Sequence, residues 1–314
     1  MTFAALRLLA AAIGRLPPKW LGPLGAAVAW IAGSTLRIRR SLVEHAMTRA
    51  GVEDPRATAR AMYRGLGLGL VELLWLAGAR PRVRDALIAR AAIDASVVEA
   101  LERALTRGSV MVFASHTGNW ELAAAAAARR LSMLGRRLFV VGKPMRARGV
   151  DAFLARLRAS LGVHVIAPRG AFAAVQRALS RGDVVVMPID QVPDRASHGL
   201  GVRFLGEAAF ADRAPATCAW RAGASVLVVA AERGSERGEA RHRVRLLGVL
   251  PPPPEGGRAG TWIDAATADA TSWLEAFVAR SPASWLWLHR RWRSPRLGRG
   301  ERRAPSLVAA EKAS

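Results

Sequence analysis

The apolar pattern divides the chain into a helical first third and an α/β region. The first part shows helical spacing of apolar residues over 41–50, 56–78 and 96–107. Beyond it come four apolar runs of strand length, at 110–115, 137–142, 184–189 and 225–232. Helical patterns lie among and after these runs, at 119–133, 150–161, 171–181, 213–222 and about 261–281. Strand and helix therefore alternate along the chain, as in proteins built on a parallel sheet.

The four apolar runs are rich in valine and do not alternate with polar residues, which is typical of strands buried on both faces. We therefore predict an α/β fold with a mostly parallel central sheet flanked by helices. The stretch 241–250 alternates better and is predicted to be an edge strand, followed by a loop at 251–257. The predicted organisation is an amino-terminal segment (1–40), a main domain (41–297) and a basic flexible tail (298–314).

The amino-terminal segment has the composition of a membrane-associating region. Residues 3–13 carry one charge, Arg7, and residues 20–36 carry none, with "RIRR" following at 37–40. The uncharged run is at the lower limit for spanning a bilayer and contains Gly and Pro, so spanning and interfacial attachment are both open. A buried core helix is the third alternative, and no convincing signal-peptidase site is present. The arginine cluster suits an anionic cytoplasmic leaflet.

The charge balance indicates an anionic partner. The chain of 314 residues has 47 Lys and Arg against 24 Asp and Glu, a formal net charge of +23. Nucleic acid, an acidic lipid surface or a phosphorylated substrate would each fit, and so would the base composition of the source genome. The single cysteine, Cys218, excludes an intrachain disulfide and a multi-cysteine metal cluster, and indicates a reducing compartment.

The stretch "MVFASHTGNWEL" (111–122) contains the main candidate chemistry. His116 follows the first strand, at the sheet edge where α/β folds bind ligands, and Glu121 falls in the first turn of the next helix. A neutral imidazole can take a proton from an attacking hydroxyl, while a carboxylate on the other ring nitrogen fixes its tautomer. Alternatively, Glu121 serves only the helix dipole and His116 is an ordinary polar residue. The spacing alone leaves both interpretations open.

Polar residues follow two other predicted strands. Asp190 and Gln191 come after 184–189, where they could bind hydroxyl groups of a substrate near His116 or orient a turn. Lys143 and Arg146 follow 137–142 and could hold a phosphate group of a substrate. Solvated loop charges are the alternative for this second pair.

Four blocks of the sequence resemble the lipid A late acyltransferases, a family of lauroyl and myristoyl acyltransferases in the lysophospholipid acyltransferase superfamily. "SHTGNWELA" is similar to its His-x4-Asp/Glu motif at His116, Gly118, Asn119, Trp120 and Glu121. The other blocks are "VGKPMRARGVDAFLARLRASLGVHVI", "PIDQVPDRASHGLGVRFLGEAAF" and "PASWLWLHRRWRSPR". The resemblance runs from about 35 to 295. It departs at Phe204-Leu205-Gly206, where the family often has Phe-Phe-Gly, and at the following "AFADRAPAT", which puts acyl-chain length and acceptor identity in doubt.

The resemblance implies a glycerolipid acyltransferase-like fold and roles for particular residues. It implies His116 as general base, Glu121 as its orienting carboxylate and Arg158 as a phosphate or transition-state contact. Arg158 and Arg156 also flank an apolar helical stripe, so they could simply solvate a helix edge. Asn119 is a candidate substrate-binding residue, with local architecture as its alternative.

The Trp-rich segment near the carboxyl end has two interpretations. Its aromatic and basic residues could form an interfacial belt at the headgroup level, or the tryptophans could close the core. The residues concerned are Trp285, Trp287, His289, Arg290, Arg291 and Trp292.

The resulting functional prediction is an O-acyltransferase at the cytoplasmic face of the inner membrane. It would move a fatty acyl chain from acyl carrier protein or coenzyme A to a hydroxyl of a membrane glycolipid, with a lipid A precursor as the expected acceptor and another lipid, such as a phosphatidylinositol mannoside, as an alternative. The donor thioester, the acceptor lipid and an anionic membrane surface are the expected partners, and no cofactor or metal is expected.

Two other classes of function remain as competitors. A metal-dependent hydrolase could use His116, Glu121, Asp190 and His198, although no two histidines have a His-Glu-x2-His spacing. A nucleic-acid or membrane-surface binder would explain the charge. Its basic residues are dispersed, however, and no reader motif is present, so nucleic acid is not an expected partner.

Overall fold

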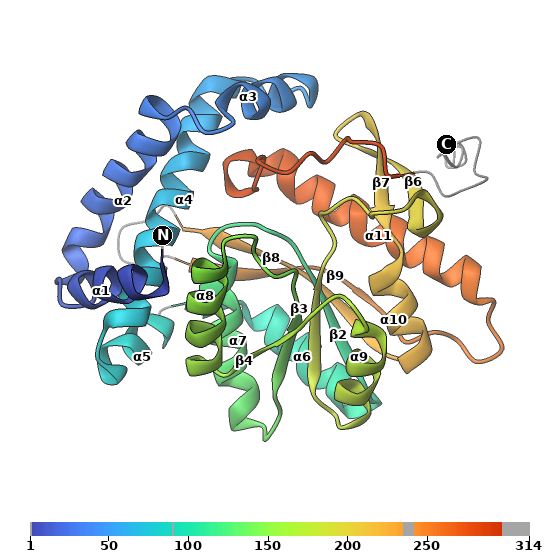
Figure 1. Cartoon of the computed structure of the whole chain (residues 1–314). Coiled ribbons are helices and arrows are strands. Elements are labelled where there is room, and N and C mark those ends of the chain that lie inside the picture. The colour runs from blue at the N-terminus through green and yellow to red at the C-terminus, as the bar shows by residue number, and fades with distance from the viewer. Residues whose placement is uncertain (1, 90, 235–241, 297–314) are drawn as a thin grey trace.

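A twisted β-sheet forms the centre of the computed structural model, which describes residues 2–89, 91–234 and 242–296 (Figure 1). Within these residues the sheet has seven strands in the order β1-β9-β8-β2-β5-β3-β4, and β6 and β7 form a separate hairpin. The strands are β1 (Ala91–Ile93), β2 (Val110–Ala114), β3 (Leu138–Val141), β4 (Val163–Ile166), β5 (Val184–Pro188), β6 (Gly199–Phe204), β7 (Glu207–Asp212), β8 (Ser225–Arg233) and β9 (His242–Leu250). The predicted tail, 298–314, lies outside the described residues.

The sheet is mostly parallel, as predicted. β8, β2, β5, β3 and β4 run in one direction, whereas β9 pairs antiparallel with β8. The prediction that 241–250 is an edge strand is wrong, because β1 pairs with the outer side of β9. β1 is too short to stand out as an apolar run, and the two central residues of edge strand β4 are exposed, so neither strand was predicted.

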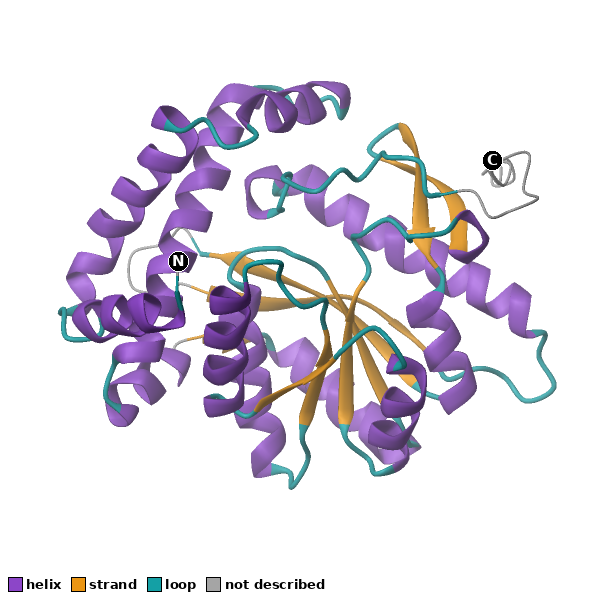
Figure 2. Cartoon of the chain, in the orientation of Figure 1, coloured by secondary structure: helices purple, strands orange, loops and turns teal. Residues whose placement is uncertain are grey.

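Eleven α-helices surround the sheet in the described part of the chain (Figure 2). They are α1 (Phe3–Ile13), α2 (Leu21–Trp30), α3 (Arg40–Arg49), α4 (Pro55–Gly78), α5 (Pro81–Ala89), α6 (Ala95–Arg107), α7 (Trp120–Met133), α8 (Arg148–Ser160), α9 (Ala171–Ser180), α10 (Ala214–Ala222) and α11 (Ala259–Arg280). All the predicted helices are confirmed within a few residues at each end, and α5 was not predicted.

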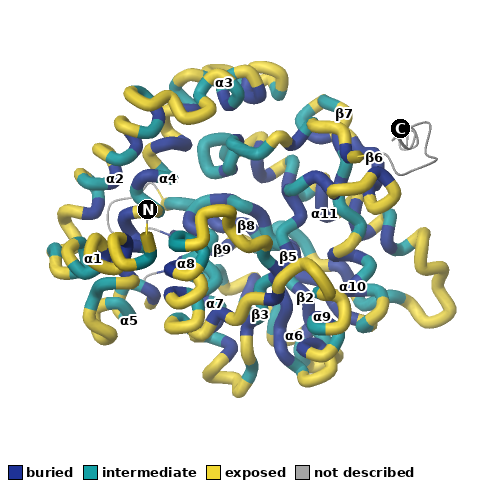
Figure 3. The backbone as a smooth tube through the Cα atoms, in the orientation of Figure 1, coloured by how far each residue is buried: buried dark blue, intermediate teal, exposed yellow. Residues whose placement is uncertain are grey.

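The central strands are buried on both faces because helices cover each side. On one face, Val110 and Val184 pack with α6 and α7. On the other, Met111 and Val185 pack with α9, α10 and α11. The strands therefore appear buried along their length, while the outer sides of α1, α3 and α9 are exposed (Figure 3). Burial on both faces is the physical reason for the valine runs without alternation.

The amino-terminal helices α1 and α2 pack on α4 through glycines. A Cβ atom on Gly14 or Gly78 would overlap the backbone of the facing helix. A Cβ on Gly25 would lie 2.6 Å from the Cα of Leu68, and one on Gly67 would overlap the carbonyl oxygen of Gly25. The helix backbones therefore meet directly at these contacts.

No single helix among the described residues is long and apolar enough to span a bilayer. Within the part of the chain that the structure describes, one pair of helical segments, Pro18–Thr35 and Arg40–Arg49, is long and apolar enough when the two are taken together, and it is bent by 85°. The bend contains Arg37 and Arg39, both with positive φ.

The Trp-rich segment closes the core. Trp285 and Trp287 are each 1% exposed and stack edge to face with ring centroids 4.9 Å apart. Arg291 is also 1% exposed, donates a hydrogen bond to the carbonyl oxygen of Phe210, and lies over the ring of Phe204. Burial lowers the pKa of Arg291 to about 10. Of the two interpretations of this segment, the structure therefore favours core closure.

Candidate active site

His116 lies in a tight turn between β2 and α7 that the rest of the protein fixes from several sides. The backbone N–H of Gly118 donates to the carbonyl oxygen of Ser284 at 2.8 Å, and that of Leu286 donates to the carbonyl oxygen of His116 at 3.0 Å. Gly118 has φ +53°, and a Cβ there would lie 2.8 Å from the carbonyl oxygen of Ala231. The turn therefore requires glycine at this position both for its backbone conformation and for space.

Asp190 holds the imidazole of His116. Its Oδ1 lies 2.9 Å from Nδ1 of the ring, and its Oδ2 accepts the backbone N–H of His116 at 2.8 Å. The indole N–H of Trp285 also donates to Oδ2, at 3.1 Å. The structure thus brings together two residues that the sequence placed after two separate predicted strands, and these strands pair with each other. Because the carboxylate accepts at Nδ1, the ring carries its proton there and keeps the Nε2 lone pair available.

Burial and charge shift the pKa values of this pair in opposite directions. Burial disfavours the charge of fully buried Asp190, but the facing His116 ring and its N–H donors outweigh this and hold the pKa of the carboxyl far below its usual range. Burial alone would lower the pKa of His116, but the Asp190 carboxylate raises it. His289 lies beside the His116 ring, with centroids 4.9 Å apart, and burial lowers its pKa.

Glu121 pairs with Arg158 and does not occupy the Nδ1 position of His116. The guanidinium donates from Nε to Oε2 at 2.9 Å and from Nη2 to Oε1. The expectation was that Glu121 would orient the ring, but the structure gives that place to Asp190. The reason is direction: Glu121, in the first turn of α7, faces α8, whereas Asp190 follows β5, the strand next to β2. The negative charge of Glu121 still acts to raise the pKa of His116.

A cavity of about 820 Å³ opens in front of His116, within the size range of small-molecule sites. Five of the seven residues predicted for the site line it: His116, Glu121, Lys143, Arg158 and Gln191. Apolar side chains form much of the remaining wall, among them Val140, Val163, Val186 and Phe172. A lining that contains both charged and apolar side chains suits a ligand with a polar head and a hydrocarbon part.

The other candidate cations differ in their surroundings. Lys143 is exposed at the cavity rim and pairs with Asp194 at 3.1 Å. Arg146 and Arg156 are exposed and do not line the cavity. The interpretation as solvated surface charge therefore holds for these two arginines.

Asn119 lies behind the site. Its side chain is buried, and its Oδ1 caps α7 by accepting the backbone N–H of Leu122 at 3.1 Å. Its Nδ2 donates to Oε2 of Glu72 at 2.8 Å. Asn119 was predicted either to bind substrate or to support the local fold, and these contacts match the second interpretation. Glu72 was missed, although a single carboxylate inside the apolar stretch "GLVELLWL" (69–76) of a helix was a signal for it.

The ligands proposed for a metal-dependent hydrolase do not all gather. In the part of the chain that the structure describes, one group of possible ligand atoms lies within 4.8 Å of one another, from His116, Asp190 and His289. Glu121 and His198 do not belong to this group. Cys218 lines the cavity, but burial raises the pKa of its thiol to about 11, so it is protonated at neutral pH.

The sequence matches a known protein family over almost its whole length. Residues 2–294 match the family described as bacterial lipid A biosynthesis acyltransferase. No individual curated protein matches the chain. The family implies an O-acyltransferase that acts on lipid, in agreement with a histidine at the mouth of a partly apolar cavity. The chain belongs to the bacterial lipid A biosynthesis acyltransferases.

Proposed function

We propose that this enzyme transfers a fatty acyl chain from a thioester of acyl carrier protein or coenzyme A to a hydroxyl of a membrane glycolipid, a lipid A precursor, with His116 as general base. The observation that carries the proposal is the His116–Asp190 contact at the cavity. In the neutral ring this contact favours the tautomer with its proton on Nδ1, facing the buried carboxylate, and with a lone pair on Nε2. Such a ring can accept a hydroxyl proton while the carboxylate stabilises the imidazolium that forms.

The reaction balances without any further reagent. Nε2 of His116 takes the proton of the acceptor hydroxyl as its oxygen attacks the thioester carbonyl carbon. The tetrahedral intermediate then expels the thiolate as the C–S bond breaks, and the imidazolium returns the proton to sulfur. The products are an ester and a free thiol, and the imidazole is again neutral.

Glu121 and Arg158 have a joint role in this proposal. The carboxylate of Glu121 accepts from two N–H groups on one edge of the guanidinium, Nε and Nη2, which fixes the Arg158 plane at the cavity wall and leaves its Nη1 group for a substrate. A fixed guanidinium stabilises negative charge that develops on a thioester oxygen or that a substrate phosphate carries. Glu121 is thus a positioning residue for Arg158 in this proposal.

The amino-terminal helices are proposed to attach the enzyme to the anionic cytoplasmic face of the inner membrane. Apolar side chains are exposed around the bend after α2, where Trp30 is 64% and Leu36 63% exposed. Arg37 and Arg39 lie in the same bend. Exposed aromatic and aliphatic groups beside arginines favour the interface of an anionic bilayer.

Purified protein tests the reaction directly. Wild type should transfer acyl groups from a thioester to lipid A precursor in detergent or vesicles, and His116→Ala should lower the rate by about 10²–10⁴. Insensitivity to chelators would remove the hydrolase alternative.

Mass spectrometry of membrane lipids with and without the gene should show one missing acyl mass on one lipid class, which names acceptor and chain length together. Wild-type rates in His116→Ala would overturn the assignment of the base.

A further inference from the structure

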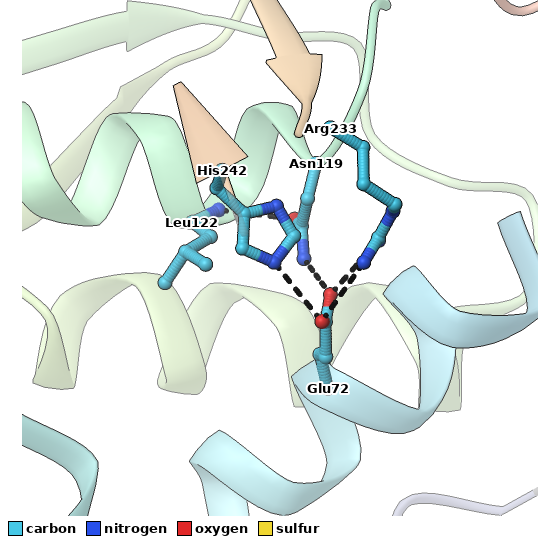
Figure 4. A network of polar contacts seen from close by, with 5 residues as sticks. All are labelled: Glu72, Asn119, Leu122, Arg233 and His242. Atoms are coloured by element: carbon cyan, nitrogen blue, oxygen red, sulfur yellow. Dashed lines mark hydrogen bonds and ion pairs between the residues drawn. The ribbon is translucent and has the colours of Figure 1, made fainter. Parts of the chain in front are cut away.

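Glu72 is a buried carboxylate on the amino-terminal helix α4 that the reaction proposed above does not use. It is 3% exposed and lies between apolar residues of its own helix. Its side chain points to the α/β domain, where Asn119, Arg233 and His242 surround it (Figure 4). These residues come from the turn before α7, the end of β8 and the start of β9. A buried charge is retained only where its partners compensate for lost water.

Every contact to Glu72 is made by a donor. Oε2 accepts from Nδ2 of Asn119 at 2.8 Å and from Nη2 of Arg233 at 3.1 Å. Oε1 accepts from Nη1 of Arg233 at 3.2 Å and lies 3.0 Å from Nε2 of His242. Burial would raise the pKa of Glu72, but the bonds from His242 and Arg233 outweigh it and lower the pKa to about 2. Glu72 is therefore charged, and both its oxygens act as acceptors.

The acceptor character of Glu72 selects the orientation of the Asn119 amide. Since a carboxylate can only accept, the NH2 group of Asn119 must face Glu72, and its carbonyl oxygen must face α7. That oxygen caps the backbone N–H of Leu122, and the backbone carbonyl of Asn119 accepts the N–H of Ala123 at 3.0 Å. A flipped amide would present a donor to a donor and lose the cap.

The capped first turn of α7 connects both halves of the proposed site. His116 lies three residues before Asn119, and Glu121, which holds Arg158, lies two residues after it. We propose that Glu72 is a positioning residue for acyl transfer: it fixes the Asn119 cap and, through it, the spacing between the His116 ring and the Glu121–Arg158 pair. This inference rests on the proposed function, and Glu72 itself touches no substrate in it.

The variant Glu72→Gln tests the inference at constant size. Arg233 contacts both oxygens of Glu72, so either orientation of a glutamine amide places N–H groups against the guanidinium. The network then loses its fixed acceptor, and we expect kcat to fall by about 100-fold, as for a displacement of about 1 Å in an active site, with KM changed little. Wild-type kcat in this variant would overturn the inference.

A rescue variant separates positioning from general damage. In Glu72→Gln/Asn119→Asp, the aspartate caps α7 and accepts from the glutamine N–H, which reverses donor and acceptor. We expect the pair to recover at least about tenfold of kcat relative to Glu72→Gln, whereas independent effects would multiply instead. A double variant no better than the product of the single ones would contradict the positioning role.

Asp183→Asn is the matched control. Asp183 is also buried, at 4% exposed, and accepts from Nη2 of Arg137 at 2.7 Å. It lies just before β5, at the amino-terminal end of the parallel strands, whereas His116 lies at their carboxyl-terminal end. At temperatures where each protein is folded, Asp183→Asn should lose stability and keep kcat and KM. An equal loss of kcat in this control would reduce Glu72 to a structural residue.

A readout without turnover keeps the two proposals distinguishable. The rate at which diethyl pyrocarbonate modifies His116, followed by peptide mass spectrometry, should change in Glu72→Gln, return toward wild type in the rescue variant and stay constant in Asp183→Asn. Unchanged labelling of His116 in Glu72→Gln would overturn the inference even if the enzyme is an acyltransferase. Absence of acyl transfer in wild type would overturn the proposed function and with it the role of Glu72 in acyl transfer, while the labelling would still show whether Glu72 positions His116.

Discussion

Asp190 lies against the His116 ring with Oδ1 2.9 Å from Nδ1, and its second oxygen accepts two further N–H groups. In Asp190→Asn, the amide oxygen would be drawn to those two donors and its NH2 group would face Nδ1. The ring would then carry its proton on Nε2 and lose its function as base, so acyl transfer should fall by about 10²–10⁴. Steady-state rates at pH 8 measure this, with Trp285→Phe, which removes only one donor, as the milder control. Near-normal transfer in Asp190→Asn would exclude the base mechanism.

The pH dependence of the reaction should reflect the raised pKa of His116. The ring is active when neutral, so kcat/KM should be lost as pH falls through a pKa above the ordinary value of about 6.5. In Asp190→Asn the fall of the residual activity at acid pH should shift to a lower pH, because the charge that raises the pKa of His116 is gone. Rates from pH 5 to 9 measure this fall in wild type and in the variant. A wild-type limb below the ordinary histidine value would contradict the assignment.

Glu121 and Arg158 should behave as one unit. If Glu121 acts by fixing the guanidinium, then Glu121→Gln, Arg158→Gln and the double variant should lose similar amounts of activity, far less than the product of the single losses. The expected single loss is of the order of 10²-fold, as for removal of one charge-stabilising donor. If Glu121 instead orients His116, its substitution should lower activity equally with or without Arg158. Transfer rates of the three variants decide between the two roles.

Glu72 should also contribute to the pH dependence of the unfolding free energy at acid pH. Its pKa, about 2 when folded, lies below the unfolded value of about 4.3, so its contribution is present above the unfolded value and is lost as pH falls toward the folded one. The difference in unfolding free energy between wild type and Glu72→Gln should be roughly 3 kcal/mol at pH 7 and should fall by about half or more at pH 3. Urea unfolding at several pH values measures it. A difference independent of pH would show that the charge of Glu72 is not the cause.

Membrane attachment should depend on the apolar residues at the bend after α2. Trp30→Ala combined with Leu36→Ala should weaken binding to anionic vesicles at least about tenfold, because each side chain would bury apolar surface in the interface. Met133→Ala is the control, since Met133 is 67% exposed at the end of α7, away from this bend. Sedimentation with vesicles measures the effect, and equal loss in the control would refute a docking role for the bend.

The sequence predicted the elements that local pattern determines. The valine runs indicated β2, β3, β5 and β8 because burial on both faces leaves no polar alternation, and helical periodicity indicated the long helices. β1 escaped because a strand of three residues carries too little pattern, and β4 escaped because its two central residues are exposed. At the site, the sequence placed His116 and Asp190 at the carboxyl-terminal ends of the parallel strands, since each follows a predicted strand.

Partner choice within the site depended on tertiary geometry. The spacing of His116 and Glu121 suggested a pair, but only the direction of the α7 turn shows that Glu121 meets Arg158 instead. Glu72 lies 47 positions before Asn119, and no local pattern connects residues at that separation. Contacts of this kind join elements that are far apart in the sequence, so they cannot be predicted from the order of the elements along the chain.

The glycine contacts that join α1 and α2 to α4 make part of the cohesion of these three helices independent of the solvent around them. Helices that meet backbone to backbone hold together mainly by van der Waals contact, which does not require water to be expelled. The apolar outer sides of the helices are then not needed for internal packing. The same three helices can therefore keep their mutual arrangement when the solvent around them changes from water to lipid. Such a change need not move α4, or the Glu72 carboxylate that α4 carries into the α/β domain.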